Sequence, residues 1–272
     1  MVALARHRIA PFLALLLCFM QSAARPRPAA DDLHAQAATA ILARDFSSPD
    51  ISFILLDGQG RVLAQRWDNP DGEVEVGSLI KPMIAVAYGQ RHATYPVFRC
   101  TGKKTCWLPR GHGQISLREA IGQSCNSYFH QLAASQPPGF AAPFLRELGV
   151  NEQSDGHSGR AAPMNLARAY FQLAARGREA AVRPVIEGME ISARRGTAKA
   201  AGVAVGSMPI AAKTGTAPCS HPRKAPGDGF ALVMTPPQGP RAVLLVRVHG
   251  KPGSAAAETA GRMLAAVENG AQ

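Results

Sequence analysis

Apolar residues along this sequence predict two groups of β-strands. Residues 51–56 and 61–67 are largely apolar and enclose the glycine-rich segment 57–60, which predicts a β-hairpin. Further short segments that look like strands occupy residues 211–217, 229–234 and 242–248. We expect the hairpin and the three later strands to form one antiparallel sheet.

Helical patterns lie at both ends of the chain and between the two groups of strands. Alanine-rich segments predict terminal helices within residues 25–40 and over 254–268. Further helices are predicted over residues 78–88, from a capping box at Ser116–Glu119, and from Pro163 to Gly177. The last has one apolar face, formed by Met164, Ala167, Tyr170, Phe171 and Ala174. This order predicts an α+β fold, with an antiparallel sheet flanked by helices and a small helical lobe.

Length and composition favour a globular protein with a packed core. The 272 residues are 46% hydrophobic and 18% charged, with no repeat of 20 to 50 residues that would indicate a fibre or solenoid. The net charge of +11 and a pI near 10 are compatible with nucleic acid, anionic lipid or an anionic polymer such as cell wall. Aromatic residues make up only 6% and do not interleave with basic runs, so we expect no nucleic-acid partner.

The N-terminus has the pattern of a secretory signal peptide. Arg6, His7 and Arg8 precede the apolar segment 12–20, which is followed by small residues up to Ala24. Nine apolar residues are too few for a bilayer that needs about 20, although an uncleaved anchor over Ile9–Ala24 is an alternative. We therefore expect an exported protein, periplasmic or in the cell envelope.

Three regions follow from this pattern. Residues 1–24 are the predicted signal peptide, and residues 25–50 are a predicted linker and N-terminal helix. No convincing linker lies between residues 50 and 254, so we expect residues 51–272 to form a single domain.

Export changes how the cysteines are interpreted, because an oxidising compartment permits disulfides. Cys100 and Cys106 flank a short polar loop, which predicts a disulfide between them; a pair of free thiols is the alternative. The sequence contains no Cys-x-x-Cys and no His-Glu-x-x-His, so neither zinc nor any other cofactor is predicted.

Three short motifs carry candidate chemistry. Ser78 and Lys81 are three residues apart, so on a helix the lysine could take the proton of a nucleophilic serine. Ser124 and Asn126 lie where a helical pattern breaks, and serve either as helix caps or as a proton relay and an amide clamp. The strand segment Lys213-Thr214-Gly215-Thr216 presents a cation and hydroxyls suited to a carboxylate.

In this order, the three motifs resemble those of penicillin-binding proteins and class A β-lactamases. Residues 76–82, Val-Gly-Ser-Leu-Ile-Lys-Pro, resemble the family's Pro-Gly-Ser-x-x-Lys-Pro. Residues 111–129, which contain Gly-His-Gly and Ser-Cys-Asn-Ser-Tyr-Phe, also resemble a stretch of this family. The same is true of residues 163–175, 212–217 and 254–264. The chain thus resembles a penicillin-binding transpeptidase domain over residues 50–268, which implies a β-lactamase/transpeptidase-like fold.

The resemblance implies a role for each motif residue. Ser78 would attack a D-Ala-D-Ala peptide bond, Lys81 would act as general base, and Ser124 would pass a proton to the leaving amine. The substrate would be bound by Asn126, Lys213, Thr214, Gly215 and Thr216, with an oxyanion hole from the backbone N–H groups of Ser78 and Thr216. The implied partners are peptidoglycan stem peptides, β-lactam antibiotics and, less directly, other cell-wall enzymes.

Alternatives to a transpeptidase remain open. Ala212 replaces the family's usual glycine, and the segment between Asn126 and Lys213 is shorter than the usual helical lobe, so a D,D-carboxypeptidase is equally compatible. A β-lactamase is disfavoured because the Glu-x-x-Leu-Asn string of class A and the Ser-x-Val of class D are absent. A non-catalytic peptidoglycan-binding module is disfavoured because every motif residue is present.

Overall fold

The computed structural model describes residues 30–153, 156–219 and 227–270. The predicted signal peptide and the first residues of the predicted linker lie outside these ranges. Within them, no helix combines the length and the hydropathy that a membrane span requires.

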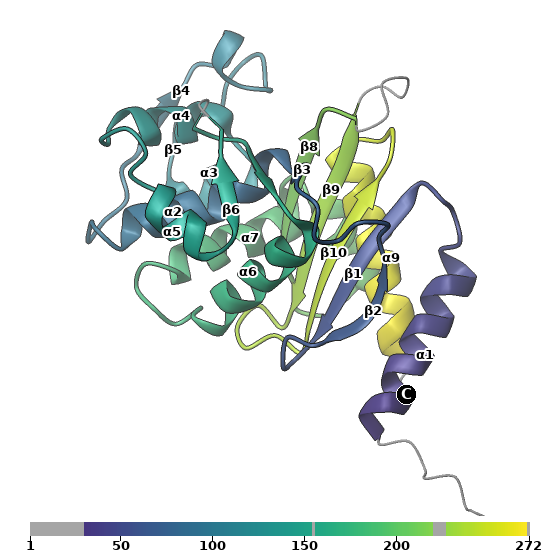
Figure 1. Cartoon of the computed structure of the whole chain (residues 1–272). Helices are drawn as coiled ribbons and strands as arrows, with labels where there is room; N and C mark the ends of the chain where they lie inside the picture. The colour runs from purple at the N-terminus through teal and green to yellow at the C-terminus, as the bar shows by residue number, and fades with distance from the viewer. Residues whose placement is uncertain (1–29, 154–155, 220–226, 271–272) are drawn as a thin grey trace, which may run out of the picture.

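A five-stranded antiparallel sheet forms the centre of the molecule, in the order β2-β1-β10-β9-β8 (Figure 1). Its strands are β1 (Ile51–Asp57), β2 (Val62–Arg66), β8 (Ala211–Ala217), β9 (Asp228–Thr235) and β10 (Ala242–Val248). Every residue of β9 is buried, as expected for a strand covered on both faces. The predicted sheet is therefore confirmed, and with it the α+β fold class.

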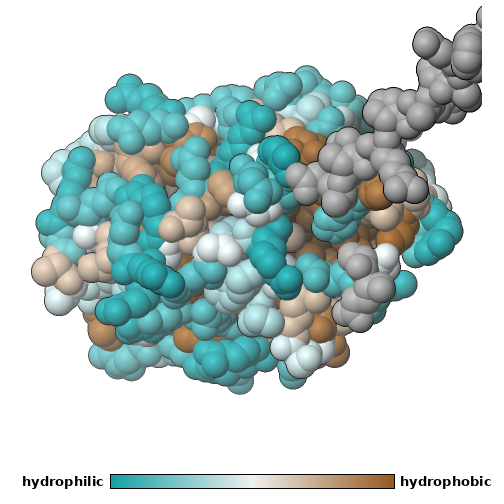
Figure 2. Space-filling view, turned by 90° about the horizontal axis from the view of Figure 1, so that it is seen from below, coloured by the Kyte–Doolittle hydropathy of each residue, from teal (hydrophilic) through white to brown (hydrophobic). Residues whose placement is uncertain are grey.

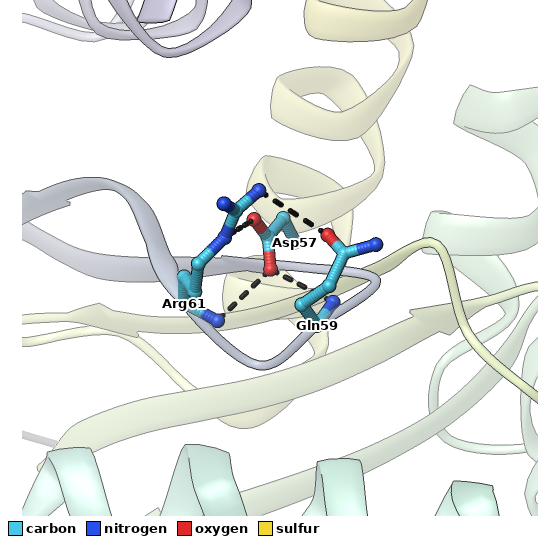
Figure 3. Close-up of polar contacts among 3 residues, drawn as sticks. All are labelled: Asp57, Gln59 and Arg61. Carbon is cyan, nitrogen blue, oxygen red and sulfur yellow. Dashed lines mark hydrogen bonds and ion pairs between the residues drawn. The ribbon is translucent and has the colours of Figure 1, made fainter. Parts of the chain in front are cut away.

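The turn of the β1–β2 hairpin is held by one aspartate (Figure 3). Oδ1 of Asp57 accepts hydrogen bonds from the backbone N–H groups of Gln59 and Arg61, both at 2.9 Å, and Oδ2 accepts one from the Arg61 guanidinium at 2.7 Å. Burial alone would raise the pKa of Asp57, but these bonds outweigh it and lower the pKa. Asp57 thus closes the turn that the glycine-rich sequence predicted.

The two terminal helices cover one face of the sheet (Figure 1). They are α1 (Ala30–Asp45) and α9 (Gly253–Gly270), and α8 (Lys199–Val205) packs beside α9. Leu42 of α1 and Ala260 of α9 share one apolar core with Leu55 and Val233 from the sheet. Both predicted terminal helices are present, although α1 continues past the predicted segment 25–40 to Asp45.

A helical lobe covers the opposite face. Its helices are α2 (Lys81–Gly89), α3 (Leu117–Gly122), α4 (Asn126–Ala134), α5 (Ala142–Glu147), α6 (Pro163–Ala175) and α7 (Arg183–Arg195). The predicted apolar face of α6 is confirmed: Phe171 is half-buried and the other four residues are buried.

Short elements that the sequence pattern did not predict complete the lobe. They are the 3₁₀ turns η1 (Gly77–Ile80) and η2 (Lys103–Thr105), the small sheet β3 (Val74–Glu75), β7 (Gly159–Ala161) and β6 (Val150–Glu152), and the pair β4 (Phe98–Cys100) and β5 (Gly113–Ile115). Helices α4, α5, α7 and α8 were also not predicted individually.

Two local predictions are corrected. The helix expected over residues 78–88 begins as the 3₁₀ turn η1, and the α-helix starts only at Lys81. Ser116 is the N-cap residue of α3, but its side chain makes no capping hydrogen bond, and the Glu119 carboxylate is paired with Arg195. The predicted capping box is therefore wrong.

The molecular surface agrees with this layering. The face seen from below in Figure 2 is mostly hydrophilic, with separate small apolar patches. Most apolar side chains are buried in the two cores on either side of the sheet.

Candidate active site

Ser78 lies in the turn η1, which packs directly against the edge strand β8. Gly77 has a φ of +53°, and a Cβ atom on it would lie 2.4 Å from the carbonyl oxygen of Thr216. From the other side, a Cβ on Gly215 would lie 2.6 Å from the carbonyl oxygen of Val76. Only glycines at both positions allow η1 and β8 to lie this close together. The close packing places the half-buried Ser78 beside β8.

Lys81 ties the start of α2 to the segment that carries the second motif. Its side chain is fully buried, and Nζ donates hydrogen bonds to the carbonyl oxygen of Ser124 at 3.0 Å and to Oδ1 of Asn126 at 2.5 Å. Nζ also lies 5.5 Å from the centre of the Phe129 ring, a favourable position for a cation. The first and second motifs are therefore in direct contact.

Ser124 has a strained backbone at the junction of α3 and α4. Its φ of +50° makes it the one non-glycine residue with a positive φ in the described part of the chain. This conformation costs about 1–2 kcal/mol and persists only where its surroundings enforce it. Here the backbone N–H of Cys125 bonds to Ala120, and Lys81 and Lys213 bond to Ser124 itself. The break in the helical pattern at this point was predicted.

Lys213 is the second buried lysine of the site. Its Nζ donates to Oγ of Ser124 at 2.8 Å and to the carbonyl oxygen of Thr214 at 2.7 Å. Burial, reinforced by the nearby charge of Lys81, lowers the pKa of Lys213 well below its ordinary value. Because Ser124 Oγ accepts from Lys213, its own proton can be donated to another group.

The two threonines of β8 are oriented by different neighbours. Thr214 Oγ1 donates to Oγ1 of Thr197 at 2.7 Å, and Thr197 in turn contacts Ser192. Thr216 is exposed, and its Oγ1 accepts a hydrogen bond from the backbone N–H of Gly253 at the start of α9. Thr216 therefore lies at the positive end of a helix dipole, a favourable place for an anion.

The eight candidate residues come together from four separate elements. Four of them, Lys81, Ser124, Asn126 and Lys213, form one hydrogen-bonded network. The turn that carries Ser78 packs on β8, where its Gly77 lies against Thr216. The supporting roles of two residues were not predicted. Thr197 follows the end of α7 without any motif, and Tyr170 donates from its buried hydroxyl to the carbonyl oxygen of Leu79 at 2.5 Å.

The cysteines differ from prediction. The four in the described ranges are free thiols, so the expected Cys100–Cys106 disulfide is wrong. Instead, Cys100 and Cys106 converge with His112 on Cys125, the residue between Ser124 and Asn126. Sequence spacing gave no sign of this cluster, because its members match no short metal-binding pattern.

No protein-family model matches the sequence, and no curated protein matches it. The fold, however, is similar to solved structures. The transpeptidase domain of Burkholderia pseudomallei penicillin-binding protein 3 is 18% identical, with a TM-score of 0.67 over 88% of this chain and 92% of that one. Pseudomonas aeruginosa PBP2, solved with WCK 5153, is also 18% identical, with a TM-score of 0.67 over 88% of this chain and 74% of that one.

A third similar structure is the D,D-transpeptidase domain of a peptidoglycan glycosyltransferase from Eggerthella lenta. It is 15% identical, with a TM-score of 0.63 over 88% of this chain and 80% of that one. Identities this low establish the architecture alone. The chain therefore has the fold of a penicillin-binding protein transpeptidase domain, as its three motifs predicted.

Proposed function

We propose that this protein is a serine acyltransferase that acts on the D-Ala-D-Ala end of peptidoglycan stem peptides and is acylated by penicillins. One observation carries the proposal: Lys81, three residues after Ser78, belongs to a largely buried hydrogen-bonded network with Ser124, Asn126 and Lys213. A serine with a buried lysine nearby is an arrangement suited to nucleophilic catalysis. The transpeptidase fold supports the same conclusion.

In the proposed reaction, Ser78 is the nucleophile. Its oxygen forms a bond to the carbonyl carbon of the penultimate D-Ala, while its proton passes to Lys81. The backbone N–H groups of Ser78 and Thr216 stabilise the oxyanion. The C–N bond then breaks and Ser124 gives its proton to the amine of the terminal D-Ala. The proton that Lys81 took from Ser78 passes to Ser124, so an acyl-enzyme with a neutral Lys81 remains.

The remaining residues bind the substrate. Oδ1 of Asn126 accepts from Lys81, so its amide N–H groups are available for a carbonyl oxygen of the peptide. The substrate carboxylate binds at Thr216, near the start of α9, and Lys213 and Thr214 lie along the same strand. A bound carboxylate would favour the ammonium form of Lys213, which burial disfavours in the free protein.

The second step decides between two activities. Transfer of the acyl group to an amine is cross-linking, and transfer to water is carboxypeptidase activity. A β-lactamase would need fast release by water, and neither of the β-lactamase motifs considered above is present in the sequence. A non-catalytic binding module would have no use for two buried lysines, whose burial is costly.

The proposed substrate implies a place outside the cytoplasm. Export through residues 1–24 would deliver the protein to the periplasm or cell envelope, where stem peptides and other cell-wall enzymes are present. The net charge of +11 would favour contact with an anionic wall polymer.

A gel assay with a fluorescent penicillin tests the proposal. The wild type should be labelled stably, and Ser78→Ala should not be labelled although it keeps its melting temperature. Ser207→Ala, which replaces an exposed serine outside the site, should be labelled like the wild type. Rapid loss of the label would favour a β-lactamase, and absence of labelling in the wild type would favour a non-catalytic module.

A further inference from the structure

Four potential metal ligands converge beside the second motif. Cys100 ends β4, Cys106 follows η2, His112 precedes β5, and Cys125 lies between α3 and α4. Their ligand atoms all lie within 4.8 Å of one another. The three cysteines are buried and the histidine is half-buried, so the cluster is largely screened from solvent.

The spacing of these atoms fits a tetrahedral zinc site. Zn–S bonds of about 2.3 Å and Zn–N bonds of about 2.0–2.1 Å place two sulfurs about 3.8 Å apart, and a sulfur and a nitrogen about 3.5 Å apart. The Sγ atoms of Cys106 and Cys125 are 3.9 Å apart. Nδ1 of His112 lies 3.5 Å from Cys100 Sγ and 3.6 Å from Cys106 Sγ. Three cysteines and one histidine are a common closed ligand set for structural zinc.

The backbone is folded to bring these ligands together. Gly102 and Gly111 both have positive φ, and a Cβ on Gly102 would lie 2.2 Å from the carbonyl oxygen of Pro109. A Cβ on Gly111 would lie 2.4 Å from the carbonyl oxygen of Cys100. The loop between the first and third ligands is therefore packed on itself, with no room for side chains at these positions.

We propose that Cys100, Cys106, His112 and Cys125 bind one zinc ion, and that this ion holds the Ser124–Asn126 segment in place. Binding converts three thiols to thiolates and releases three protons, and the complex with neutral His112 carries one negative charge. The part of the proposal that concerns acylation rests on the proposed function. The part that concerns the metal does not.

The position of Cys125 explains why a metal would matter to the site. Its neighbours are Ser124, whose φ of +50° is strained, and Asn126, which accepts from Lys81. A metal bond at Cys125 would fix both neighbours without touching substrate, so Cys125 is a positioning residue. The buried lysines hold the same segment from the other side.

A second group, Cys219, Asp228 and His249, provides an internal control. Its atoms also lie within 4.8 Å of one another. However, Nδ1 of His249 is 2.6 Å from Oδ1 of Asp228, a hydrogen-bond distance. Two ligands of one zinc ion would be separated by about 3.3 Å at these bond lengths. This group is therefore a buried histidine–aspartate pair beside a thiol.

Metal analysis of the purified exported protein tests the first part of the proposal. We expect one zinc per chain at the cluster and, after exchange of zinc for Co²⁺, absorption bands of a tetrahedral thiolate-bound ion. Cys106→Ser and His112→Ala should each weaken zinc binding at least about 100-fold, the upper range for losing even an outer-shell contact. Cys219→Ser should bind zinc and Co²⁺ as the wild type does.

Several results would overturn the site. They are absence of the Co²⁺ thiolate band in the wild type, unchanged zinc affinity in Cys106→Ser, or loss of the metal in Cys219→Ser alone. A disulfide among Cys100, Cys106 and Cys125, seen by mass spectrometry of the unreduced protein, would also overturn it. If Cys106→Ser does not fold, the wild-type Co²⁺ spectrum and the disulfide analysis still decide.

Penicillin labelling before and after zinc removal tests the second part. Chelation should slow labelling, and added Zn²⁺ should restore it. Unchanged labelling in the zinc-free protein would overturn the positioning role. If the wild type is never labelled, the proposed function fails, whereas metal content and the Co²⁺ spectrum still decide whether the site exists.

Discussion

At the scale of single residues, the site is defined by two buried lysines that contact the same serine. Lys81 bonds to the backbone of Ser124 and Lys213 to its hydroxyl. Burial, and secondarily the charge of Lys81, lowers the pKa of Lys213. Neighbouring buried ammonium groups repel each other, so proton loss from one of them is favoured. This is the electrostatic setting in which a lysine can accept a proton from serine.

Replacing Lys81 should therefore slow acylation strongly. Lys81→Ala is expected to lower the second-order rate of penicillin acylation by about 10²-fold or more, the usual scale for loss of a general base. Stopped-flow measurement with a chromogenic penicillin gives this rate. Lys199→Ala, at an exposed lysine, should be acylated at the wild-type rate. An equal loss of rate in both variants would contradict the assignment of Lys81 as general base.

Lys213 should make stability depend on pH. The unfolded chain has a lysine with an ordinary pKa near 10.4, whereas the folded pKa is lowered, so between these values the unfolded state binds more protons. The free energy of unfolding should then rise with pH through this window, by at most about 1.4 kcal/mol per pH unit. Urea unfolding from pH 7 to 10 should show a flatter profile for Lys213→Met, and identical profiles would contradict the lowered pKa of Lys213.

The motif residues could be predicted from the sequence, but the residues that contact and orient them could not. Two short sequence motifs contain Ser78 with Lys81 and Ser124 with Asn126, because a helix or a turn fixes the spacing within each pair. Thr197 meets Thr214 only through tertiary packing, so no local pattern could have indicated it. The same holds for the cysteine–histidine cluster, and the oxidising compartment led the analysis to a disulfide instead.

At the scale of elements, the contact between η1 and β8 decides whether the site is assembled. Gly77 makes that contact possible, because any Cβ there would collide with the carbonyl oxygen of Thr216. The turn and the strand would have to separate to accept a side chain, which would displace Ser78 from its proposed oxyanion hole.

Gly77→Ala should accordingly lose acylation by about 10²-fold, the effect of a displacement of about 1 Å. Gly206→Ala is a matched control, because Gly206 has a similar positive φ of +65° but no atom within 4 Å of its added Cβ. Both variants place a Cβ at a positive φ, which L-residues rarely adopt, but only Gly77→Ala adds a collision with another backbone segment. Labelling rates that fall equally in the two variants would show that strain, not the contact, is responsible.

Elements were predictable where burial is continuous. Strands β8 and β10 were predicted with the bounds they have, because nearly all of their residues are buried. Strands β3, β6 and β7 have only two or three residues each, which is too short for any period to show. Glu119 shows a different limit, since a local capping signal was overridden by a distant partner, Arg195.

At the scale of the whole molecule, the sheet separates two apolar cores. The core on the lobe side supports the site, and the core on the other side includes Leu42 from α1. The sequence pattern places residues 25–50 outside the predicted domain 51–272, and that division stays a prediction. The packing of α1 against α9 and β2 provides a way to test it.

Truncation of Leu42 measures how far α1 contributes to the fold. Leu42 is fully buried, so Leu42→Ala should lower the free energy of unfolding by about 2–5 kcal/mol. Leu33→Ala in the same helix removes a side chain that is 53% exposed, and should change stability by no more than about 0.5 kcal/mol. Urea denaturation that gives equal values for the two variants would place α1 outside the cooperative unit.

The central claim, that Ser78 is the nucleophile, is tested most directly by intact-protein mass spectrometry after incubation with benzylpenicillin. We predict an increase equal to the mass of one antibiotic molecule, located by fragmentation on Ser78 in the peptide that also contains Lys81. The increase should be absent in Ser78→Ala. An adduct on any other residue, or an adduct that persists in Ser78→Ala, would contradict the account.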